Sequence, residues 1–335
     1  MARSRAPKKP PKHGSEHYDV AVVGGGPAGL SAAIWLARYL HSVVVIDSGD
    51  PRNWETLSIN GYLGLPGVCP ADLRGGGRQT CRELGVTLRD GLVLRTDHGD
   101  DDRFIVCVEG GGRLTADRLL LAIGLRDVWP DIPGLEHVYG ANAHVCPDCD
   151  GFDARGKRVA VIGTGRKAVT MALNLTTWTR DIVICTNGRP ADVDAPEYCD
   201  KLDAHDIRIL TDPIAGIGYR GHTVECLELA NGSRLDVDKL FFAIAQYPAD
   251  DLGAQLGCTR DRGGHIVVDE RLHTSAHNVF AAGDIVPGPQ LAVVAAAQGA
   301  VAAVSIHKSL VRDDQKLMPR RRRSARRRIS AASSP

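Results

Sequence analysis

The sequence predicts an α/β fold with two Rossmann-like domains, and three observations support this prediction. An apolar strand followed by a glycine-rich loop and a helical stretch occurs twice, at residues 18–40 and 157–177. A chain of 335 residues is long enough for two ordinary domains. A hydrophobic content of 43% with 5% aromatic residues, together with 37 glycines, fits layers of helices and strands joined by many tight turns.

The first unit has a complete nucleotide-binding pattern. Its strand, glycine loop, helix and second strand are predicted at residues 18–23, 24–29, 30–40 and 42–46. Gly24, Gly26 and Gly29 form a Gly-x-Gly-x-x-Gly loop, which lets the backbone approach a pyrophosphate at the helix N-terminus. Asp47 follows the second strand, 23 positions after Gly24, where a carboxylate can accept hydrogen bonds from an adenosine ribose. This unit is therefore predicted to bind a dinucleotide.

The second unit repeats the pattern with a different ending. Its strand, glycine loop and second strand are predicted at residues 157–162, 163–168 and 181–185. Gly163 and Gly165 supply the loop, but the position that matches Asp47 is Thr186. No carboxylate is available there for an unphosphorylated ribose, and Arg189 is the one residue near enough to meet a 2′-phosphate. The alternative is a Rossmann half that is kept as scaffold with weakened nucleotide affinity.

A third signal lies near the C-terminus. Residues 278–282 are predicted to form a short apolar strand that ends in Gly283 and Asp284, and an Ala- and Val-rich helix follows at about residues 291–310. A strand that leads into an acid at a helix entrance can place the carboxylate on a ribityl or ribose hydroxyl. The alternative is that Asp284 is a simple helix N-cap.

The most informative stretch for chemistry is Cys146-Pro147-Asp148-Cys149-Asp150-Gly151. Two thiols separated by two residues can close an easily reduced disulfide, and such pairs have a low thiolate pKa. The acid after the second cysteine can move protons during thiol exchange. The alternatives are a structural disulfide or half of a zinc site, which would require a second Cys-x-x-Cys or a close His pair. The other seven cysteines are scattered singly, so no metal site is expected. His144 either tunes the thiolate or is a polar loop residue.

Charge is distributed unevenly along the chain. Residues 1–17 carry a net charge of +4 and residues 311–335 one of +7, so a chain with a net charge of +1 has an acidic body of −10. The tails at 1–15 and 311–335 are predicted to be disordered. Arginines at 320–323 and 326–328 could contact nucleic acid or an acidic partner, but no aromatic residues lie between them, which favours a solvated tail. No apolar run of membrane-spanning length and no signal peptide are recognised, so a cytoplasmic protein is expected.

Five motifs in this order and spacing resemble the low-molecular-weight thioredoxin reductases, which are two-dinucleotide-domain, FAD-dependent pyridine nucleotide-disulfide oxidoreductases. The motifs are Gly24 to Gly29 with Asp47, Leu121 to Gly124 ahead of Ile132 to Gly134, Cys146 to Gly151, Gly163 to Ala168, and Val279 to Asp284. The resemblance implies an FAD domain split between residues 16–124 and 247–310. It also implies an inserted NAD(P)-type domain at 125–246, a homodimer, and rotation of the inserted domain.

The resemblance also implies a role for each site residue. Cys149 matches the flavin-proximal sulfur and Cys146 the thiol that attacks the substrate disulfide. Asp150 matches the acid–base carboxylate, and Asp284 the acid that binds the ribityl–phosphate region of FAD. Electrons would then pass from NADPH through FAD and the two cysteines to a protein disulfide such as thioredoxin.

Three departures from the family pattern concern the nucleotide and flavin sites. Thr186-Asn187-Gly188 replaces a His-Arg-Arg cluster that grips the NADPH 2′-phosphate. Typical reductases carry a serine and paired acids in the helix after the second glycine loop, whereas this chain has Arg166 and Lys167 there. These two cations could hold phosphates in place of the missing cluster. The usual Arg-Gln pair beside the flavin is Pro289-Gln290, which leaves only Gln290 for the cofactor.

These departures keep other functions open. Some relatives use ferredoxin or another donor, and others oxidise a small dithiol and pass the electrons through FAD to oxygen. The run from Asp47 to Asn53 resembles the dithiol oxidases, although these usually have His after the second cysteine, and Asp150 favours a reductase. A further alternative is a flavin redox sensor whose arginine-rich tail contacts nucleic acid. The expected substrate is a thioredoxin-like protein or a small dithiol or disulfide.

Overall fold

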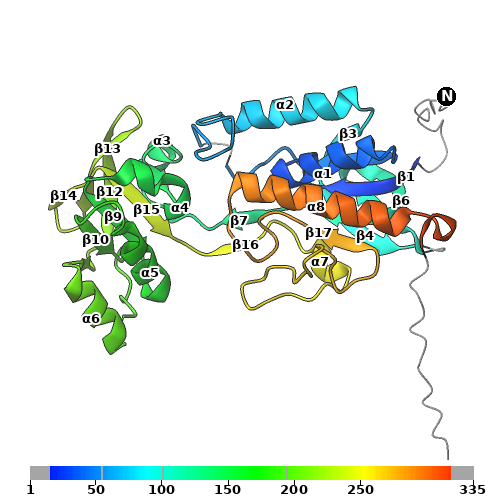
Figure 1. Ribbon diagram of the computed structural model, residues 1–335. Coiled ribbons are helices and arrows are strands. Elements are labelled where there is room, and N and C mark those ends of the chain that lie inside the picture. The colour runs from blue at the N-terminus through cyan, green and yellow to red at the C-terminus, as the bar shows by residue number, and fades with distance from the viewer. Residues whose placement is uncertain (1–15, 54–55, 100–101, 194, 318–335) are drawn as a thin grey trace, which may run out of the picture.

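The computed structural model describes residues 16–317, with the exception of 54–55, 100–101 and 194. Two α/β domains lie side by side and are joined by a pair of short crossing strands (Figure 1). We call them the split domain, which contains both ends of the described chain, and the inserted domain, which is built from residues between them. The predicted fold class, with two Rossmann-like domains of which one is split by the other, is confirmed. The exact domain limits, at 124/125 and 246/247, stay a prediction.

The basic tails lie largely outside the described residues. This applies to residues 1–15 and 318–335, and therefore to both arginine clusters and to most of the predicted disorder. Within the described part, Asp313–Gln315 form the 3-10 turn η4, where the sequence predicted no structure.

The split domain is built on a seven-stranded sheet. Its strands are β1 (Glu16–Val23), β2 (Val43–Asp47), β3 (Thr87–Asp90), β4 (Val93–His98), β5 (Phe104–Val108), β6 (Gly112–Leu121) and β17 (Val279–Ala281). β6 pairs in parallel with β1, and its end pairs in parallel with β17, so the parallel order is β3-β2-β1-β6-β17. The first half of β6 pairs antiparallel with β5, which in turn pairs antiparallel with β4. β17, which follows the inserted domain in the sequence, thus joins the same sheet as the first strand, β1.

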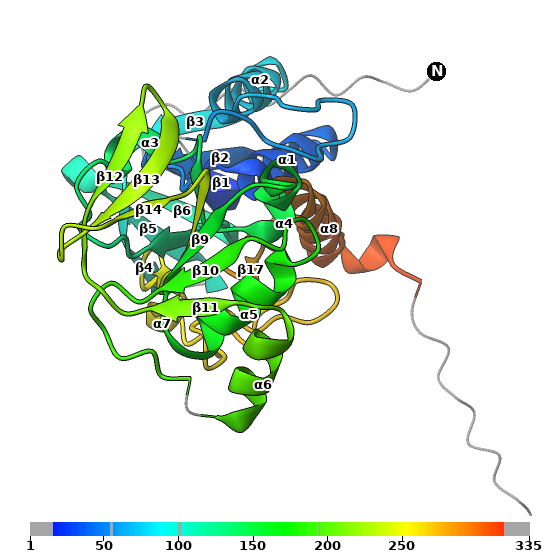
Figure 2. The same cartoon turned by 90° about the vertical axis from the view of Figure 1, so that its left-hand side faces the viewer.

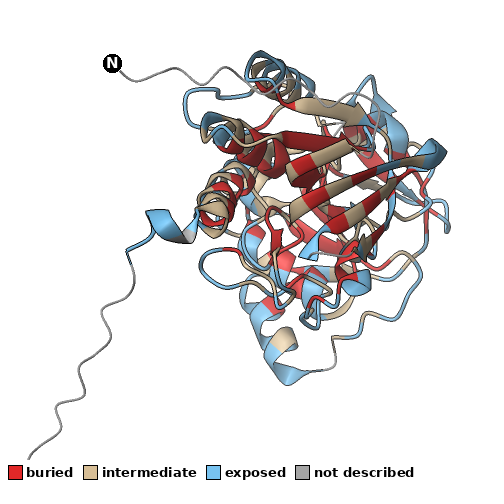
Figure 3. Cartoon of the chain, turned by 90° about the vertical axis from the view of Figure 1, so that its right-hand side faces the viewer, coloured by how far each residue is buried: buried red, intermediate tan, exposed pale blue. Residues whose placement is uncertain are grey.

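Both faces of this sheet are buried, which explains its nearly continuous apolar strands. Along β1, Val20 and Val22 pack toward the helical face, whereas Ala21 and Val23 belong to the core on the opposite face. Figure 3 shows this central buried layer between helices and loops. A strand with both faces covered needs apolar side chains in both phases of its two-residue repeat.

Helices cover this sheet, and two of them pack against each other beside the first glycine loop. The helices of the split domain are α1 (Pro27–Arg38), α2 (Pro70–Glu83), α7 (Leu252–Gln255) and α8 (Ala292–Leu310), and a 3-10 turn, η2, spans Glu109–Gly111. α1 begins at Pro27, earlier than the predicted Leu30, because Gly26 is its N-cap and the fixed φ of proline suits the first helical position. α8 packs directly on α1, and a Cβ at Gly299 would collide with the Ala28 backbone.

α8 corrects one expectation from the sequence. This 19-residue helix is long and apolar enough to cross a membrane by length and composition alone, although no such run was recognised in the sequence. A third of its most apolar window, 33%, is buried inside the protein. Its buried residues include Ala302, Ala303 and Ile306, which share a core with α1. One face of α8 therefore packs in the core of the split domain.

The inserted domain has two sheets. The parallel five-stranded sheet has the order β11-β10-β9-β15-β8, and the antiparallel three-stranded sheet the order β12-β13-β14. Their strands are β8 (Ala143–His144), β9 (Val159–Gly163), β10 (Ile182–Cys185), β11 (Arg208–Leu210), β15 (Lys239–Ala243), β12 (Ile214–Arg220), β13 (Thr223–Leu229) and β14 (Arg234–Asp236). The helical segments are α3 (Leu135–Val138), α4 (Pro147–Asp150), α5 (Gly165–Leu175), α6 (Pro196–Ala204) and the 3-10 turn η3 (Gly151–Ala154).

The five-stranded sheet of the inserted domain is also covered on both faces (Figure 2). Along β9, Val159 and Val161 pack with α5, whereas Ala160 and Ile162 pack in the same core as residues of the three-stranded sheet. Four clusters of buried apolar residues therefore form the interior, two in each domain.

Two short strands carry the chain between the domains. β7 (Leu125–Asp127) leaves the split domain and β16 (Gln246–Pro248) returns to it, and they pair antiparallel with Asp127 opposite Gln246. Because the two crossing segments pair as one two-stranded ribbon, the covalent connection between the domains is narrow.

Candidate active site

The two cysteines of the Cys-x-x-Cys motif are joined by a disulfide. Their Cα atoms are 5.3 Å apart, within the range that a disulfide requires. The single-turn helix α4 brings them together: Cys146 is its N-cap, Pro147 occupies the first helical position, and the Cys149 amide donates to Cys146 Sγ at 3.1 Å. Both cysteines are half-buried. A Cβ at Gly151 would collide with the Trp178 ring, so the glycine lets this turn pack closely on the indole.

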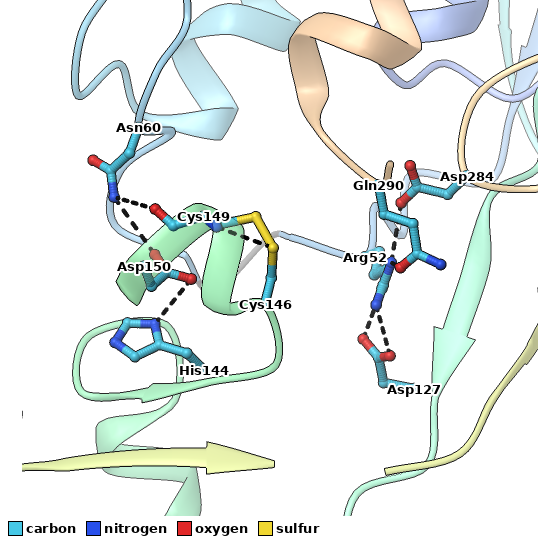
Figure 4. Close-up of a disulfide and its surroundings, with 9 residues drawn as sticks. All are labelled: Arg52, Asn60, Asp127, His144, Cys146, Cys149, Asp150, Asp284 and Gln290. Carbon is cyan, nitrogen blue, oxygen red and sulfur yellow. Dashed lines mark hydrogen bonds and ion pairs between the residues drawn. A yellow bond between two sulfur atoms is a disulfide. The ribbon is translucent and has the colours of Figure 1, made fainter. Parts of the chain in front are cut away.

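Asp150, the acid next to the second cysteine, lies between residues of both domains. His144 Nδ1 is 3.3 Å from Asp150 Oδ2. From the split domain, Asn60 Nδ2 donates to the Cys149 carbonyl oxygen at 3.3 Å and to Asp150 Oδ1 at 3.5 Å. Figure 4 shows Asp150 between Asn60 and His144, with the two sulfurs on the other side of the α4 turn. The disulfide-bearing turn therefore lies at the contact between the two domains.

The first glycine loop has the shape that the ADP half of FAD requires. A Cβ at Gly29 would collide with the Gly24 carbonyl oxygen, and one at Gly25 with the Asp47 carboxylate, so loop, helix and acid pack without space for side chains. A Cβ at Gly26 would meet nothing within 4 Å. Gly26 therefore borders open space at the N-terminus of α1, where a pyrophosphate binds in Rossmann units. These residues fit FAD.

Asp47, the predicted ribose acid, is buried and paired with two arginines from α2. Arg74 contacts Asp47 Oδ2 in a short ion pair, and Arg78 NH1 lies 3.2 Å from the same oxygen. Arg78 also bridges to Asp90 Oδ1 at 2.6 Å. Asp47 Oδ1 accepts a longer hydrogen bond, of 3.3 Å, from the Gly49 amide. The two arginines compensate the charge of this buried carboxylate, whose oxygens are the acceptors that ribose hydroxyls require.

Asp284 and Gln290, the two remaining predicted contacts to the flavin half, meet at an arginine from elsewhere in the chain. Arg52 NH1 donates to Asp284 Oδ2 at 3.0 Å and to Gln290 Oε1 at 2.7 Å. The same guanidinium binds Asp127 of β7 through two hydrogen bonds, of 2.8 and 2.9 Å. Burial raises the pKa of Asp284, and the Arg52 charge opposes this rise. Figure 4 shows Arg52 at the centre of this group, which we call the Arg52 cluster.

Arg52 also supplies a cation that the C-terminal segment lacks. The sequence has Pro289 before Gln290, where the resemblance to the reductases implies an arginine. The Arg52 guanidinium lies against Gln290 instead, and Gln246 of β16 donates to Asp127 Oδ1 at 3.0 Å. The cluster thus connects the loop after β2, the Gly-Asp segment and both crossing strands.

The second glycine loop is closed by the protein's own backbone. The Gly165 amide donates to the Ala191 carbonyl oxygen at 2.8 Å. Thr186, at the position of the ribose acid, is fully buried, and its hydroxyl donates to the Arg189 carbonyl oxygen at 2.6 Å. The Arg189 side chain in turn donates to the Thr186 carbonyl oxygen at 3.4 Å. These residues do not fit the adenosine ribose phosphate of NADPH.

A pocket of about 430 Å³ lies between this loop and the disulfide turn. Its lining residues are Pro147, Arg166, Lys167, Thr170, Met171 and Asn174. Lys167 Nζ donates to the Ile244 carbonyl oxygen in a short hydrogen bond, and burial lowers its pKa. Arg166 and Lys167 were the two cations expected to hold a phosphate. The ammonium group of Lys167 instead binds a backbone carbonyl oxygen. Among the described residues, no group of three or more His, Cys, Asp or Glu side chains could hold a metal ion.

Sequence reasoning missed Arg52, Asp127, Asn60 and the two arginines of α2 as parts of the site. Arg74 and Arg78 are four residues apart on a helix, a spacing that puts both on one face, but nothing in the sequence indicates that this face meets Asp47. The catalytic and binding roles assigned to Cys146, Cys149, Asp150 and the glycine loops stay predictions.

The sequence model of the pyridine nucleotide-disulphide oxidoreductase family matches residues 18–299, which span both domains. The chain belongs to this family. The resemblance to the FAD-dependent disulfide oxidoreductases is thereby confirmed, and the relatives named thioredoxin reductase agree with it.

Individual family members are similar over different lengths. The thioredoxin reductase tcpT of Claviceps purpurea is 30% identical over 284 residues, which cover 81% of this chain and 87% of that protein. The probable thioredoxin reductase of Arthroderma benhamiae is 33% identical over 202 residues, 58% of this chain, and the match spans only half of that relative, 50%. The crystal structure of HlmI has a TM-score of 0.82 at 32% identity and covers 87% of this chain and 92% of HlmI.

Proposed function

We propose that this member of the family is an FAD-dependent dithiol–disulfide oxidoreductase of thioredoxin-reductase type, in which Cys146 and Cys149 are the redox pair. The observation that carries the proposal is the Cys146–Cys149 disulfide in a half-buried turn that contacts the other domain through Asn60. An isolated structural disulfide has no need of an adjacent acid with partners from two domains. The name of the Claviceps purpurea relative, a thioredoxin reductase, supports a thioredoxin-like protein as one substrate.

FAD would be held by the split domain. Gly24, Gly26 and Gly29 would receive its pyrophosphate and Asp47 its adenosine ribose, and Gly283, Asp284 and Gln290 would contact the ribityl and flavin half. When bound, FAD supplies a two-electron carrier, and the protein supplies position and electrostatics.

The steps assigned to the protein are thiol–disulfide exchange. In the reducing direction, the Cys146 thiolate attacks one sulfur of a substrate disulfide, forms a mixed disulfide and releases one substrate thiolate, which takes up a proton. The Cys149 thiolate then attacks Cys146 Sγ, which re-forms the Cys146–Cys149 disulfide and releases the second substrate thiol. Two electrons pass from the cysteine pair to the substrate, and Asp150 carries the protons.

The electron donor that the family favours is NADPH, held at Gly163, Gly165 and Arg166. The closed second loop does not support this donor, since the Gly165 amide and the Thr186 hydroxyl are both bound to backbone carbonyl oxygens. The second candidate function is therefore a dithiol oxidase, in which the same exchange runs in reverse and oxygen is the final acceptor. A homodimer in the cytoplasm is part of the proposal in either case, and a nucleic-acid-binding redox sensor has no support among the described residues.

Anaerobic titration of the purified yellow protein with NADPH, NADH and dithiothreitol separates these functions. Bleaching of the flavin by NADPH within a turnover time supports the reductase. Bleaching by dithiothreitol alone, with recovery of the colour in air, supports the oxidase. A protein that binds no FAD, or whose flavin none of the three reduces, would contradict both functions.

A further inference from the structure

The pocket beside the disulfide turn is a cavity to which the proposed exchange steps assign no ligand. Its volume of about 430 Å³ is in the range of pockets that bind small molecules. Pro147 of α4 forms one wall, and residues of α5 form the rest. Because Pro147 directly follows Cys146, the pocket begins next to the cysteine that is assigned to attack the substrate. A molecule in this pocket therefore lies close to the redox pair.

The pocket follows one face of α5. Arg166, Thr170 and Asn174 succeed one another at the i, i+4 spacing, so they share a face of the helix. All three are exposed, whereas Met171 beside them is buried and adds apolar surface. None of the described residues that line the pocket carries a carboxylate. The lining thus combines positive charge, hydrogen-bonding groups and apolar surface.

Helix stability does not explain the two cations of the pocket. Arg166 and Lys167 lie in the first turn of α5, where the helix dipole disfavours positive charge, and this turn contains no acid. The Arg166 guanidinium has no hydrogen bond or ion pair with any described residue. Asp192 lies beside Gly165 but forms no ion pair with Arg166. The charge of Arg166 is therefore not used within the described part of the chain.

NADPH does not account for Arg166 either. The second glycine loop is closed by the Ala191 carbonyl oxygen, and Thr186 at the ribose position is fully buried. Lys167 donates to the Ile244 carbonyl oxygen, so Arg166 is the cation of this pocket that is left to meet a ligand. A guanidinium pairs best with a planar anion such as a carboxylate, through two parallel hydrogen bonds.

We propose that this pocket binds the carboxylate of a small disulfide or dithiol substrate, with Arg166 as the specificity-determining residue. The inference rests on the proposed function of Cys146 and Cys149. The hydroxyl and amide groups on the same face of α5 supply further hydrogen bonds to the substrate. Of the two substrate classes expected from the sequence, a thioredoxin-like protein and a small molecule, the size of the pocket favours the small molecule.

The acids near the disulfide lie apart from the pocket. Asp150 is on the side of the α4 turn that faces Asn60 and His144 (Figure 4). Asp148 and Asp153 belong to α4 and η3 and do not line the pocket. An anion in the pocket therefore contacts cations and no carboxylate, whereas the opposite side of the turn is acidic.

The reaction that the pocket serves is the exchange already assigned to the redox pair. The Cys146 thiolate attacks one sulfur of the bound disulfide, and the first substrate thiol leaves. The Cys149 thiolate then displaces the second substrate thiol and re-forms the Cys146–Cys149 disulfide. Two electrons pass from the pair to the substrate, and the two cysteine thiol protons pass to the released thiols. Arg166 takes no part in these bonds and acts on how tightly the anion is held.

The test compares three disulfide probes of similar length that differ in charge. Dithiodipropionate is dianionic, hydroxyethyl disulfide is neutral and cystamine is dicationic. The purified full-length protein is reduced with dithiothreitol, freed of excess reductant in the absence of oxygen, and mixed with each probe at neutral pH and low salt. Quenching with iodoacetamide and mass spectrometry of the peptide that contains both cysteines give the rate at which Cys146–Cys149 re-forms. Each rate is divided by that of the same probe with mercaptoethanol, which removes differences in intrinsic reactivity.

Two substitutions of Arg166 and one control isolate the effect of its charge. Arg166→Gln removes the charge and keeps a polar side chain, and Arg166→Glu reverses the charge. Arg180→Gln removes another exposed arginine, beyond the other end of α5, and matches Arg166→Gln in net charge. Thermal unfolding of each variant shows whether its fold is kept.

In the wild type we expect dithiodipropionate to react faster than cystamine, and high salt to reduce this difference. Arg166→Gln should slow the reaction with dithiodipropionate by about threefold or more, the effect of one exposed ion pair, and should leave the neutral probe unchanged. Arg166→Glu should reverse the order of the two charged probes. Arg180→Gln should behave as the wild type.

Three results would overturn the proposal: a wild type without preference for the anion, an Arg166→Gln variant that keeps the wild-type preference, and an Arg180→Gln variant that loses it to the same extent. Failure of the proposed function gives a different result. In that case none of the probes would re-form the Cys146–Cys149 disulfide faster than it oxidises mercaptoethanol, whatever its charge, and both proposals would fall.

Discussion

At the scale of single residues, Arg52 joins three side chains of the candidate site. Its guanidinium binds two carboxylates and an amide, and its side chain is 18% exposed. Asp127 is even more buried, with 3% of its side chain exposed. Asp127 and the half-buried Asp284, whose side chain is 24% exposed, both depend on this cation, so its loss leaves their charges without compensation.

Arg52→Gln should therefore destabilise the protein by about 3 kcal/mol, because Asp127 and Asp284 would stay buried without their cation. Urea unfolding followed by circular dichroism measures the free energy of unfolding. The matched control is Arg95→Gln, which removes an ion pair of 2.7 Å with Asp97 on a side chain that is 66% exposed, and should cost less than about 1 kcal/mol. Equal losses in the two variants would show that the Arg52 cluster is not a stabilising unit.

Two buried single cysteines should be inert, in contrast to the redox pair. Burial raises the pKa of Cys81 to about 11 and that of Cys185 to about 12. Since the thiolate is the form that reacts, the reactive fraction at pH 7 falls about tenfold for each unit by which the pKa rises. Alkylation with iodoacetamide followed by peptide mass spectrometry should label exposed Cys199 at least about a hundred times faster than either buried thiol. Rapid labelling of Cys81 or Cys185 in the folded protein would contradict this packing.

Residues that are neighbours in the sequence could be predicted as a site, and residues brought together by the fold could not. Cys146, Cys149 and Asp150 lie within one turn, so their proximity follows from the sequence. Arg52 is separated from Asp127 by 75 positions and from Asp284 by 232. An arginine after a proline carries no local signal of a partner that far away, because its position is set by the packing of the whole domain.

At the scale of elements, the two glycine loops have similar sequences and different surroundings. The first loop borders open space at Gly26, and the second is closed by the carbonyl oxygen of Ala191. The pattern of glycines predicted both strand–loop–helix units correctly. It could not predict that a segment after β10 would bind the second loop, since that segment has no periodic pattern.

Gly26→Ala should weaken FAD binding without destabilising the apoprotein. The φ of Gly26 is −79°, which any residue adopts, and the added methyl group would meet only open space where the cofactor is proposed to lie. We expect the dissociation constant for FAD to rise by about tenfold or more, measured by flavin fluorescence, with an unchanged unfolding free energy of the apoprotein. Unaltered affinity would place the pyrophosphate elsewhere.

The control for Gly26 is a glycine in a helix that faces solvent. Gly75 is exposed in α2, and a Cβ there meets nothing within 4 Å. Gly75→Ala should stabilise the protein by about 0.5–1 kcal/mol, because alanine restricts the unfolded chain, and should leave FAD affinity unchanged. A loss of affinity in this variant would mean that helix α2 contacts the cofactor directly.

The antiparallel strands were the elements that the sequence did not indicate. β12, β13 and β14 form an antiparallel sheet of their own, and β4 and β5 extend the first sheet. Their buried residues are separated by exposed or half-buried ones, as in β4, where two exposed residues lie between Val93 and Thr96. Such short half-buried strands gain their stability from neighbours rather than from a continuous apolar run.

At the scale of the whole molecule, the disulfide turn belongs to one domain and the predicted FAD site to the other. The domains are joined by the β7–β16 ribbon and touch where Asn60 meets Cys149 and where the Leu57 amide donates to the Gly140 carbonyl oxygen at 3.3 Å. Few polar contacts of this kind must break for the inserted domain to rotate. Such a rotation would let the cysteines meet first the flavin and then a substrate.

The central claim is that Cys146 and Cys149 exchange electrons with bound FAD, and anaerobic reduction tests it most directly. Dithiothreitol is added in the absence of oxygen to the flavin-loaded full-length protein, and the flavin absorbance is followed in the wild type, in Cys149→Ser and in the Cys199→Ser control. The wild type and the control should lose their yellow colour, and Cys149→Ser should keep both its FAD and its colour. Bleaching of Cys149→Ser as fast as the wild type would contradict the claim.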